Sequence, residues 1–277
     1  MPFLLIDTSY TLFYRFYATL RWYSLAHPED KYPDDYDWID NEIVKNMFGK
    51  KYFDGFKKII KQYDITDESK IIFIRDCNRK DIWRNTFYDL YKANRDEIYG
   101  TDSSKPFKGG PFFKYAYDYI IPNLMKEKGC KTIKHDHLEA DDIIYLTKNY
   151  IREQYPDEDI VIVASDCDLL QLIDEKTKIV TLQNKLLNNK SKGDPKIDLE
   201  LKIICGDKSD NINGCFKKCG EKTALKLIKD KGLLAEKFKK NPGSLDTYAL
   251  NKILIDMENI PDKLKQSCNQ VIKSMNL

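Results

Sequence analysis

Acidic side chains stand just beyond most of the short apolar runs in this sequence. They are Asp7, Asp76, Glu139, Asp141, Asp142, Asp166 and Asp168. If the runs are parallel strands of one sheet, the acids at their carboxyl ends converge on one crevice. Carboxylates crowded together raise one another's pKa values or bind cations. Hard divalent ions such as Mg²⁺ prefer oxygen ligands, and a pair of them in an acidic crevice suits phosphodiester hydrolysis.

Each acid also has an ordinary structural explanation. An Asp after a strand commonly caps a helix or closes a turn. Asp141 and Asp142 would complement a helix dipole, and Asp166 could cap a helix that begins at Leu169. These explanations treat the acids one at a time and do not explain why most strands end in acid. The whole pattern therefore favours a metal site.

The elements that must position these acids alternate along the chain. Short apolar runs, typical of strands in a sheet covered on both faces, are FLLI (3–6), IIFI (71–74), KTIKH (131–135), IVIVA (160–164) and KIVTL (178–182). The longer segments 42–63 and 140–155 between them are helix-like. This alternation predicts an α/β fold with a mainly parallel sheet and helices on both faces.

Two domains are expected from the rest of the pattern. Residues 1–183 form the α/β body, within which 77–122 is polar and basic, lacks an evident strand and reads as helices joined by a flexible piece. Residues 184–196 form a polar loop, and 198–277 read as helices only. The predicted second domain is therefore an α-helical module at 184–277.

Composition limits the classes of protein to consider. The chain has 277 residues, 42% of them hydrophobic, which is enough for a sizeable core. It lacks an apolar run long enough for a membrane span, and its start is unlike a signal peptide, so we expect an intracellular protein whose 7 Cys stay reduced. The spacing of Cys and His does not match a zinc site.

The small formal charge of +2 hides a strong segregation of charge. Residues 29–42 hold seven acids against one Lys, whereas residues 217–240 hold nine Lys against three acids. Such segregation can create a local basic face on a nearly neutral protein. Solvated helix faces are the ordinary explanation, and nucleic-acid binding is the functional one.

Several motifs in a fixed order are more specific than any of these patterns. They are LLIDTSYTLFYRFYAT (4–19), YKANRDE (91–97), LEADD (138–142), ASDCDLLQL (164–172) and GDKSDN followed by GEKTALKLI (206–228). In this order they resemble the flap endonuclease and 5′-3′ exonuclease superfamily, in its stand-alone phage, bacterial and viral form. The resemblance covers about residues 3–235. It implies a PIN-like, Rossmann-like nuclease body, a helical arch at about 77–122 and a helix–three-turn–helix at about 201–232.

The resemblance also implies roles for individual residues. The acids named above, together with Asp207 and Asp210, match the metal-binding acids of the family. Lys92 and Arg95 match the basic pair at the base of the arch, which acts on the scissile phosphate. Arg84 lies eight residues before Lys92. This is close to two helical turns, so we expect Arg84 to share a helix face with the pair.

Further residues are expected to contact DNA. Phe13 or Tyr91 is a candidate for stacking on a terminal base, although both are also ordinary core residues. In the helix–three-turn–helix, backbone amides and a helix N-terminus would approach duplex phosphates. The residues concerned are Gly214, Lys217, Lys218, Gly220, Lys222 and Thr223.

The chain departs from the family pattern in two places. The family often holds K⁺ in the turn, but here Lys218 stands where a Gly is usual and there is one extra residue. This weakens the expectation of a K⁺ site, and Lys217 and Lys218 could supply its charge instead. A Gly/Pro loop is usual at 24–50, where this chain has a long acidic and aromatic segment.

The resulting expectation is a structure-specific 5′ nuclease that uses two Mg²⁺ or Mn²⁺ ions. It would act near 5′ flaps, 5′ ends or RNA primers in DNA replication and repair. Its partners would be branched or nicked duplex DNA and RNA–DNA hybrids, with no membrane, and it would be a monomer. The alternatives are a PIN-type ribonuclease, a DNA-binding protein without activity, and a haloacid-dehalogenase-like phosphatase, which would need a second Asp where Ser9 stands.

Overall fold

A five-stranded sheet forms the centre of the computed structural model, which describes residues 1–33, 36–95 and 107–277. The strand order is β3-β2-β1-β4-β5, and every neighbouring pair is parallel. The strands are β1 (Phe3–Asp7), β2 (Ile71–Arg75), β3 (Lys131–Lys134), β4 (Ile160–Val163) and β5 (Thr177–Val180). The predicted parallel α/β sheet is therefore confirmed.

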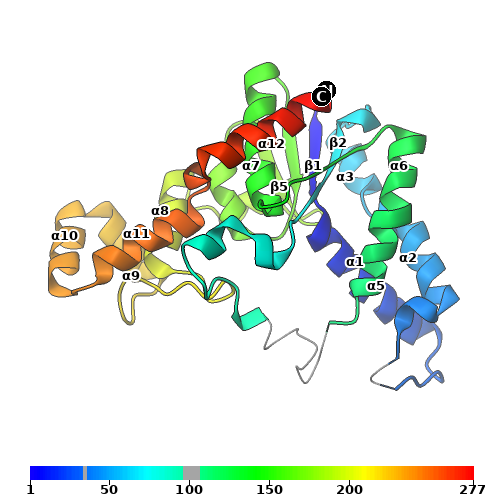
Figure 1. Cartoon of the computed structure of the whole chain (residues 1–277), viewed down its shortest axis with the longest axis horizontal. Coiled ribbons are helices and arrows are strands. Elements are labelled where there is room, and N and C mark those ends of the chain that lie inside the picture. Colours follow the sequence, from blue (N-terminus) through cyan, green and yellow to red (C-terminus); the bar gives the residue numbers. More distant parts are fainter. Residues whose placement is uncertain (34–35, 96–106) are drawn as a thin grey trace.

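Side chains of the central strands alternate between two buried clusters, as the two-residue period of a strand requires. Leu5 and Ile72 enter one cluster, beneath α7 (Ala140–Gln154) and α12 (Asp262–Ser274). Leu4 and Phe73 enter the opposite cluster. That face is covered by α1 (Thr8–Ala26), α2 (Glu42–Asp54), α3 (Lys57–Gln62), α5 (Gly110–Tyr115) and α6 (Ile121–Lys128). Figure 1 shows these helices on the two sides of the sheet.

The segment 42–63 is broken into two helices where one was expected. The break falls at Gly55 and Phe56, between α2 and α3. A Cβ on Gly55 would lie 2.4 Å from the Arg15 guanidinium, so the chain passes α1 closely there. The break also brings Phe56 and Ile59 fully into the core. Helical spacing alone could not reveal this bend.

The segment 77–122 combines short turns with one longer helix. Its first part contains the 3₁₀ turns η3 (Arg79–Asp81) and η4 (Trp83–Thr86), and its residues 96–106 lie outside the described part of the chain. Its second part runs through α5, a π-helical turn η5 (Ala116–Ile120) and α6. Pro122 at the start of α6 lacks a backbone N–H, which accounts for the widened turn before it.

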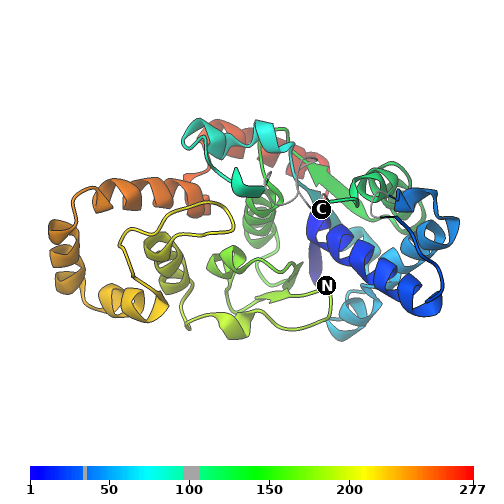
Figure 2. The same cartoon turned by 90° about the horizontal axis from the view of Figure 1, so that it is seen from below.

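The C-terminal residues form a helical lobe at one end of the molecule and then return to the sheet (Figures 1 and 2). The lobe contains α8 (Pro195–Cys205), α9 (Glu221–Lys229), α10 (Lys231–Lys240) and α11 (Ser244–Ile255). Cys268 and Ile272 of α12 are fully buried in the cluster beneath α7. The boundary between 183 and 184 stays a prediction, and α12 completes the core of the body. Among the described residues, no helix is long and apolar enough to cross a membrane.

Candidate active site

Five of the predicted acids line one pocket of about 310 Å³ at the carboxyl edge of the sheet. Asp7 is the last residue of β1, Asp76 and Asp166 follow β2 and β4, and Glu139 and Asp141 lie at the start of α7. The parallel arrangement therefore brings together acids that are distant in the sequence, as predicted.

Backbone amides hold three of these carboxylates in place. Asp7 Oδ1 accepts a hydrogen bond from the amide of Tyr10 at 2.9 Å. Asp76 Oδ1 accepts one from Ala140 at 2.8 Å, and Asp166 Oδ1 accepts one from Asp168, also at 2.8 Å. Each bond uses one oxygen of its carboxylate. The capping explanation is thus correct for Asp7. Asp166 is also a cap, but it caps the 3₁₀ turn Cys167–Leu172 and not a helix that begins at Leu169. Capping through one oxygen is compatible with cation binding.

The pocket is electrostatically unfavourable without a bound cation. Burial and then the neighbouring Asp76 raise the pKa of Asp7 to about 7. Burial and then Asp166 raise the pKa of Asp141 well above its usual range. For Glu139 burial acts in the same direction, but Lys92 and Arg84 outweigh it and lower its pKa to about 2. The candidate metal ligands in the pocket are carboxylate oxygens, and such ligands fit a hard divalent ion.

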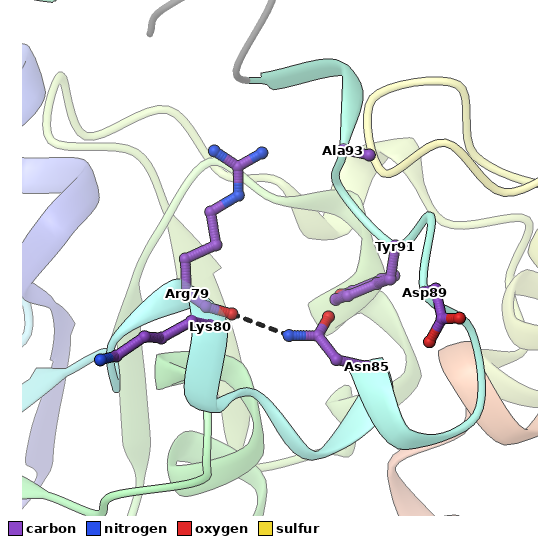
Figure 3. Close-up of a pocket in the computed structure, with 6 residues that line it drawn as sticks. All are labelled: Arg79, Lys80, Asn85, Asp89, Tyr91 and Ala93. Carbon is purple, nitrogen blue, oxygen red and sulfur yellow. Dashed lines mark hydrogen bonds between the residues drawn. The ribbon is translucent and has the colours of Figure 1, made fainter. Parts of the chain in front are cut away.

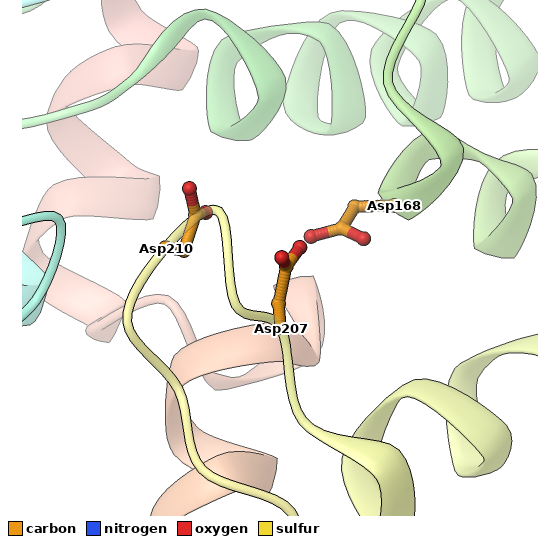
Figure 4. A group of neighbouring side chains, drawn as sticks. All are labelled: Asp168, Asp207 and Asp210. Atoms are coloured by element: carbon orange, nitrogen blue, oxygen red, sulfur yellow. The ribbon is translucent and has the colours of Figure 1, made fainter. Parts of the chain in front are cut away.

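A second acidic cluster lies beside this pocket. The carboxylates of Asp168, Asp207 and Asp210 come within 4.8 Å of one another (Figure 4). Asp168 lies in η6 (Cys167–Leu172) after β4, and the other two lie in the loop between α8 and α9. Burial and then Asp166 raise the pKa of Asp168 to about 7. Oxygen donors gathered this closely also fit a divalent cation.

The predicted basic pair, Lys92 and Arg95, connects the two acidic groups. Lys92 Nζ lies 2.5 Å from Glu139 Oε1 and 3.5 Å from Asp210 Oδ2. Arg95 Nη2 lies 2.6 Å from Asp210 Oδ1. Burial tends to lower the pKa of Lys92, but Glu139, Tyr91 and Asp210 together outweigh it and raise the pKa well above the usual range. The site therefore holds a fixed positive charge between its two sets of carboxylates.

The predictions for Arg84 and Asp142 need correction. Arg84 belongs to a 3₁₀ turn and not to a helix face shared with Lys92. Its buried guanidinium donates to both oxygens of Asp142 at 2.7 and 2.8 Å and to Glu139 at 2.9 Å. Asp142 also accepts a bond from Trp83 Nε1 at 2.9 Å. This pair orients Glu139, so Arg84 is not placed to act on substrate and Asp142 is not placed to bind a metal ion.

The two candidate stacking residues differ in accessibility. Phe13 is 39% exposed at the rim of the acidic pocket, where it stacks on Phe107 with ring centroids 5.2 Å apart. Tyr91 is buried, and its hydroxyl donates to Glu139 at 3.0 Å and to Asp210 at 3.3 Å. The stacking prediction is therefore wrong for Tyr91, while Phe13 remains available.

Residues 195–229 form two helices, α8 and α9, joined by an extended turn. Gly214 is required in this turn because a Cβ there would lie 2.7 Å from the Cys205 carbonyl oxygen. Lys218 has a φ of 55°, so the position does need the left-handed backbone that glycine would adopt more easily. The exposed residues of the turn and the start of α9 include Gly214, Lys217, Lys218, Gly220, Lys222 and Thr223.

Comparison with known proteins decides the family. The family model described as "5'-3' exonuclease, N-terminal resolvase-like domain" matches residues 2–197. The chain belongs to the 5′-3′ exonuclease family. It is a 5′ nuclease, as the sequence motifs indicated.

Curated members of the 5′-3′ exonuclease family resemble most of the chain. The 5′-3′ exonuclease of Buchnera aphidicola subsp. Schizaphis graminum is 30% identical over 236 residues, which is 82% of this chain and 70% of the relative. The 5′-3′ exonuclease of Bacillus subtilis is 31% identical over 187 residues, 64% of this chain and 57% of the relative. The thermostable DNA polymerase I of Thermus caldophilus is 27% identical over 229 residues, 80% of this chain but 24% of the relative.

Solved structures of a bacteriophage T5 protein share the fold. One, crystallised with metal ions, has a TM-score of 0.70 at 17% identity, covering 99% of each chain. A flap endonuclease variant from the same phage, in a complex with DNA and metal ions, has a TM-score of 0.68 at 16% identity, again covering 99% of each chain.

Two side chains at the candidate active site were not found from the sequence. Lys202 of α8 pairs with Asp168 at 2.6 Å and also with Asp207, which places a second cation at the acidic cluster. Its position one helical turn before the GDKSDN motif is a signal that could have revealed it. Trp83, which holds Asp142, lies in a region without regular periodicity and gave no such signal.

Proposed function

We propose that this nuclease is structure-specific and depends on two divalent ions, Mg²⁺ or Mn²⁺. The single observation that carries the proposal is the pair of adjacent carboxylate groups with Lys92 between them. One ion would be held by pocket acids such as Asp7, Asp141 and Asp166, and the other by Asp168, Asp207 and Asp210. Two such ions supply activation of water and neutralisation of charge at the phosphodiester.

The side chains of the chain itself bind and orient the substrate in this proposal. Lys92 and Arg95 would leave part of their pairing with Glu139 and Asp210 to stabilise the negative charge that develops on the scissile phosphate. Phe13 and Phe107 at the rim would stack on the base next to that phosphate. Exposed lysines of the turn before α9 would contact duplex phosphates without reading sequence.

The proposed substrates are duplexes with a 5′ flap or a free 5′ end, including nicked duplexes and RNA–DNA hybrids. The fold shared with a phage flap endonuclease that was solved with DNA supports this choice. We further propose that the protein acts as a monomer, because a single chain is able to supply both acidic groups and the basic pair between them. A K⁺ ion in the turn is not part of the proposal, because Lys218 occupies the left-handed position.

Cleavage of a labelled 5′-flap duplex tests the proposal. We expect Mg²⁺-dependent cutting near the junction, loss of cutting in EDTA, and loss in Asp168→Asn with DNA binding retained. Uncut flaps, nicked duplexes and hybrids in the presence of Mg²⁺ or Mn²⁺ would refute it. A preference for single-stranded RNA over all of these would instead support the PIN-type ribonuclease.

A further inference from the structure

The chain segment that carries the basic pair is bonded along its length to the 206–212 loop, which carries Asp207 and Asp210. The backbone N–H of Lys92 donates to the carbonyl of Asp210 at 2.9 Å. Two residues further on, Asn94 Nδ2 donates to the carbonyl of Lys208, also at 2.9 Å. Figure 3 shows this segment, through Tyr91 and Ala93, beside the loop drawn in yellow.

Two further hydrogen bonds complete the contact. In one the loop is the donor: Asn211 Nδ2 donates to the carbonyl of Leu90 at 2.8 Å. In the other, Tyr88 Oη donates to the carbonyl of Asn211 at 3.2 Å. The contact thus runs from residue 88 to residue 94 on one side and from 208 to 211 on the other. We name these four residue-to-residue bonds, including Lys92 to Asp210, the junction.

The backbone on both sides of the junction is in an uncommon conformation. Lys92 has a φ of 57° and Asn211 a φ of 60°. Asparagine adopts this left-handed conformation more readily than other residues with a side chain, but lysine is disfavoured there. The conformation at Lys92 is therefore imposed by its surroundings: the junction holds its N–H, and Arg79 donates to its carbonyl.

The 206–212 loop can impose the left-handed conformation on Lys92 because the two ends of the loop are hydrogen-bonded to each other. Asp207 and Ile212 exchange both backbone hydrogen bonds, at 2.9 and 2.7 Å. The loop continues directly into the turn 213–220, which exposes Lys217 and Lys218 before α9. One short stretch of chain therefore joins the proposed duplex contact, two metal-cluster acids and the support of the basic pair.

We propose that Asn94 and Asn211 are positioning residues that couple the basic pair to DNA seated on the turn before α9. Neither lines the acidic pocket or the acidic cluster, so they act through Lys92 and Arg95. The inference rests on the proposed role of the basic pair at the scissile phosphate. It adds that the loop which continues into the proposed duplex contact also holds the two cations in position for cleavage.

The test uses Asn94→Asp and Asn211→Asp in the full chain. Each keeps the size of the side chain and replaces the donated hydrogen bond by repulsion from a carbonyl. We expect the single-turnover cleavage rate of a 5′-flap duplex to fall by roughly ten- to a hundredfold, because small misplacements of catalytic groups are costly. The affinity for the same duplex, measured in EDTA, should change by less than about twofold, because the lysines of the turn are untouched.

Two further variants separate positioning from folding. Asn211→Gly keeps the left-handed backbone accessible and removes only the amide, so it should also slow cleavage. Asn259→Asp is the matched control, since Asn259 Nδ2 donates to the exposed carbonyl of Lys252 at 3.1 Å, away from the site. We expect this control to cleave at the wild-type rate. A wild-type rate for Asn94→Asp or for both Asn211 variants would overturn the inference.

A double-mutant cycle with Lys92→Ala gives the decisive readout. If Asn94 acts through Lys92, Asn94→Asp should cost much less in the Lys92→Ala background than in the wild type. Equal losses in the two backgrounds would show a merely structural effect and overturn the coupling. Wild-type cleavage by Lys92→Ala and by Arg95→Ala would instead refute the proposed role of the basic pair.

Discussion

The Asp7 carboxylate has two roles, since one oxygen caps a helix while the group as a whole carries charge into the acidic pocket. It caps α1 through the amide of Tyr10, and it faces other acids in the pocket. Asn can also cap a helix but carries no charge. We therefore expect Asp7→Asn to lose at least about a hundredfold in cleavage rate, as the loss of a preorganised charge does.

The same variant should gain stability in the absence of metal. The raised pKa of Asp7 means that its charged form is disfavoured in the fold. Removing that charge at pH 8 should stabilise the metal-free protein by on the order of 1 kcal/mol, or about 2–4 °C in Tm. Differential scanning calorimetry in EDTA checks this. Asp67→Asn, which changes an N-cap outside the described site, should leave cleavage unchanged; a lower Tm for Asp7→Asn would contradict the prediction.

Ion binding should depend on pH between about 6 and 8. The pKa values of Asp7 and Asp168 are raised to about 7, above the usual value for Asp, so the folded metal-free protein binds more protons than the unfolded chain between about pH 4 and 7. Its stability should fall as pH rises through that window. Binding of Mg²⁺ must displace those protons, so the affinity should rise with pH up to about 8.

Calorimetry in two buffers of different ionisation enthalpy measures the proton release directly. We expect protons to be released on Mg²⁺ binding at pH 6.5 and little release at pH 8.5. The same release at both pH values would show that Asp7 and Asp168 are already ionised in the metal-free protein.

The sequence was sufficient to place a functional residue where that residue lies at the carboxyl end of a strand. Asp7, Asp76, Asp141 and Asp166 could be placed in this way, because parallel strands end at one edge. Arg84 could not, since its partner Asp142 depends on the path of a 3₁₀ turn that has no periodic signal.

The turn before α9 allows charge and backbone strain to be separated at the scale of one element. Lys218 has a φ of 55°, which costs a residue with a side chain about 1 kcal/mol or more. Lys218→Gly should therefore raise the Tm while weakening duplex binding, because the proposed phosphate contact would be lost. Lys217→Gln should weaken duplex binding without that gain in Tm.

Salt titrations of duplex affinity check the binding half of this prediction. Each lysine that contacts a phosphate contributes about one unit to the slope of log affinity against log salt concentration. Lys263→Gln on α12 is the control and should leave the slope unchanged. Unchanged slopes for both turn variants would show that this turn does not contact DNA.

The elements themselves were predictable to different degrees. The strands β1, β2 and β4 were located because a buried strand is a short apolar run. The partly exposed strands β3 and β5 carry lysines and were located from shorter groups of Ile and Val. The bend at Gly55 was missed because the apolar spacing continues across it, and the packing of Gly55 against the Arg15 side chain involves a residue that is distant in the sequence. The short turns at 79–86 were missed because side chains such as Trp83 and Arg84 are fixed by distant partners rather than by local pattern.

For the molecule as a whole, α12 is expected to be essential to the body. Ile272 is fully buried and lies in the cluster beneath α7, whereas Val271 beside it is 38% exposed. Ile272→Ala should lower the free energy of unfolding by about 2–5 kcal/mol, as large-to-small changes in a core do. Val271→Ala should change it by less than about 0.5 kcal/mol.

Urea unfolding followed by circular dichroism measures both values. A change of less than about 1 kcal/mol for Ile272→Ala would mean that α12 contributes little to the core, since even Ile→Val usually costs about that much. The return of α12 to the sheet could not be predicted from the sequence, because an amphipathic helix does not reveal which surface it covers. The acidic segment after α1 was recognised as unusual from its charge, but charge alone did not indicate what the segment contacts.

The left-handed backbone at Lys92 bears on which residues could replace it. Single-base changes of a lysine codon yield Asn, Arg, Gln, Glu, Thr, Ile or Met. Among these, Asn fits a φ of 57° with the least strain. Asn would, however, leave Glu139 and Asp210 without the cation that lies 2.5 and 3.5 Å from them, and leaving a buried charge unpaired costs about 3–5 kcal/mol. That loss exceeds the strain of about 1–2 kcal/mol for a lysine with left-handed backbone. The buried carboxylates therefore favour a cation at a position where the backbone favours asparagine, and Lys92 satisfies the first demand at the expense of the second.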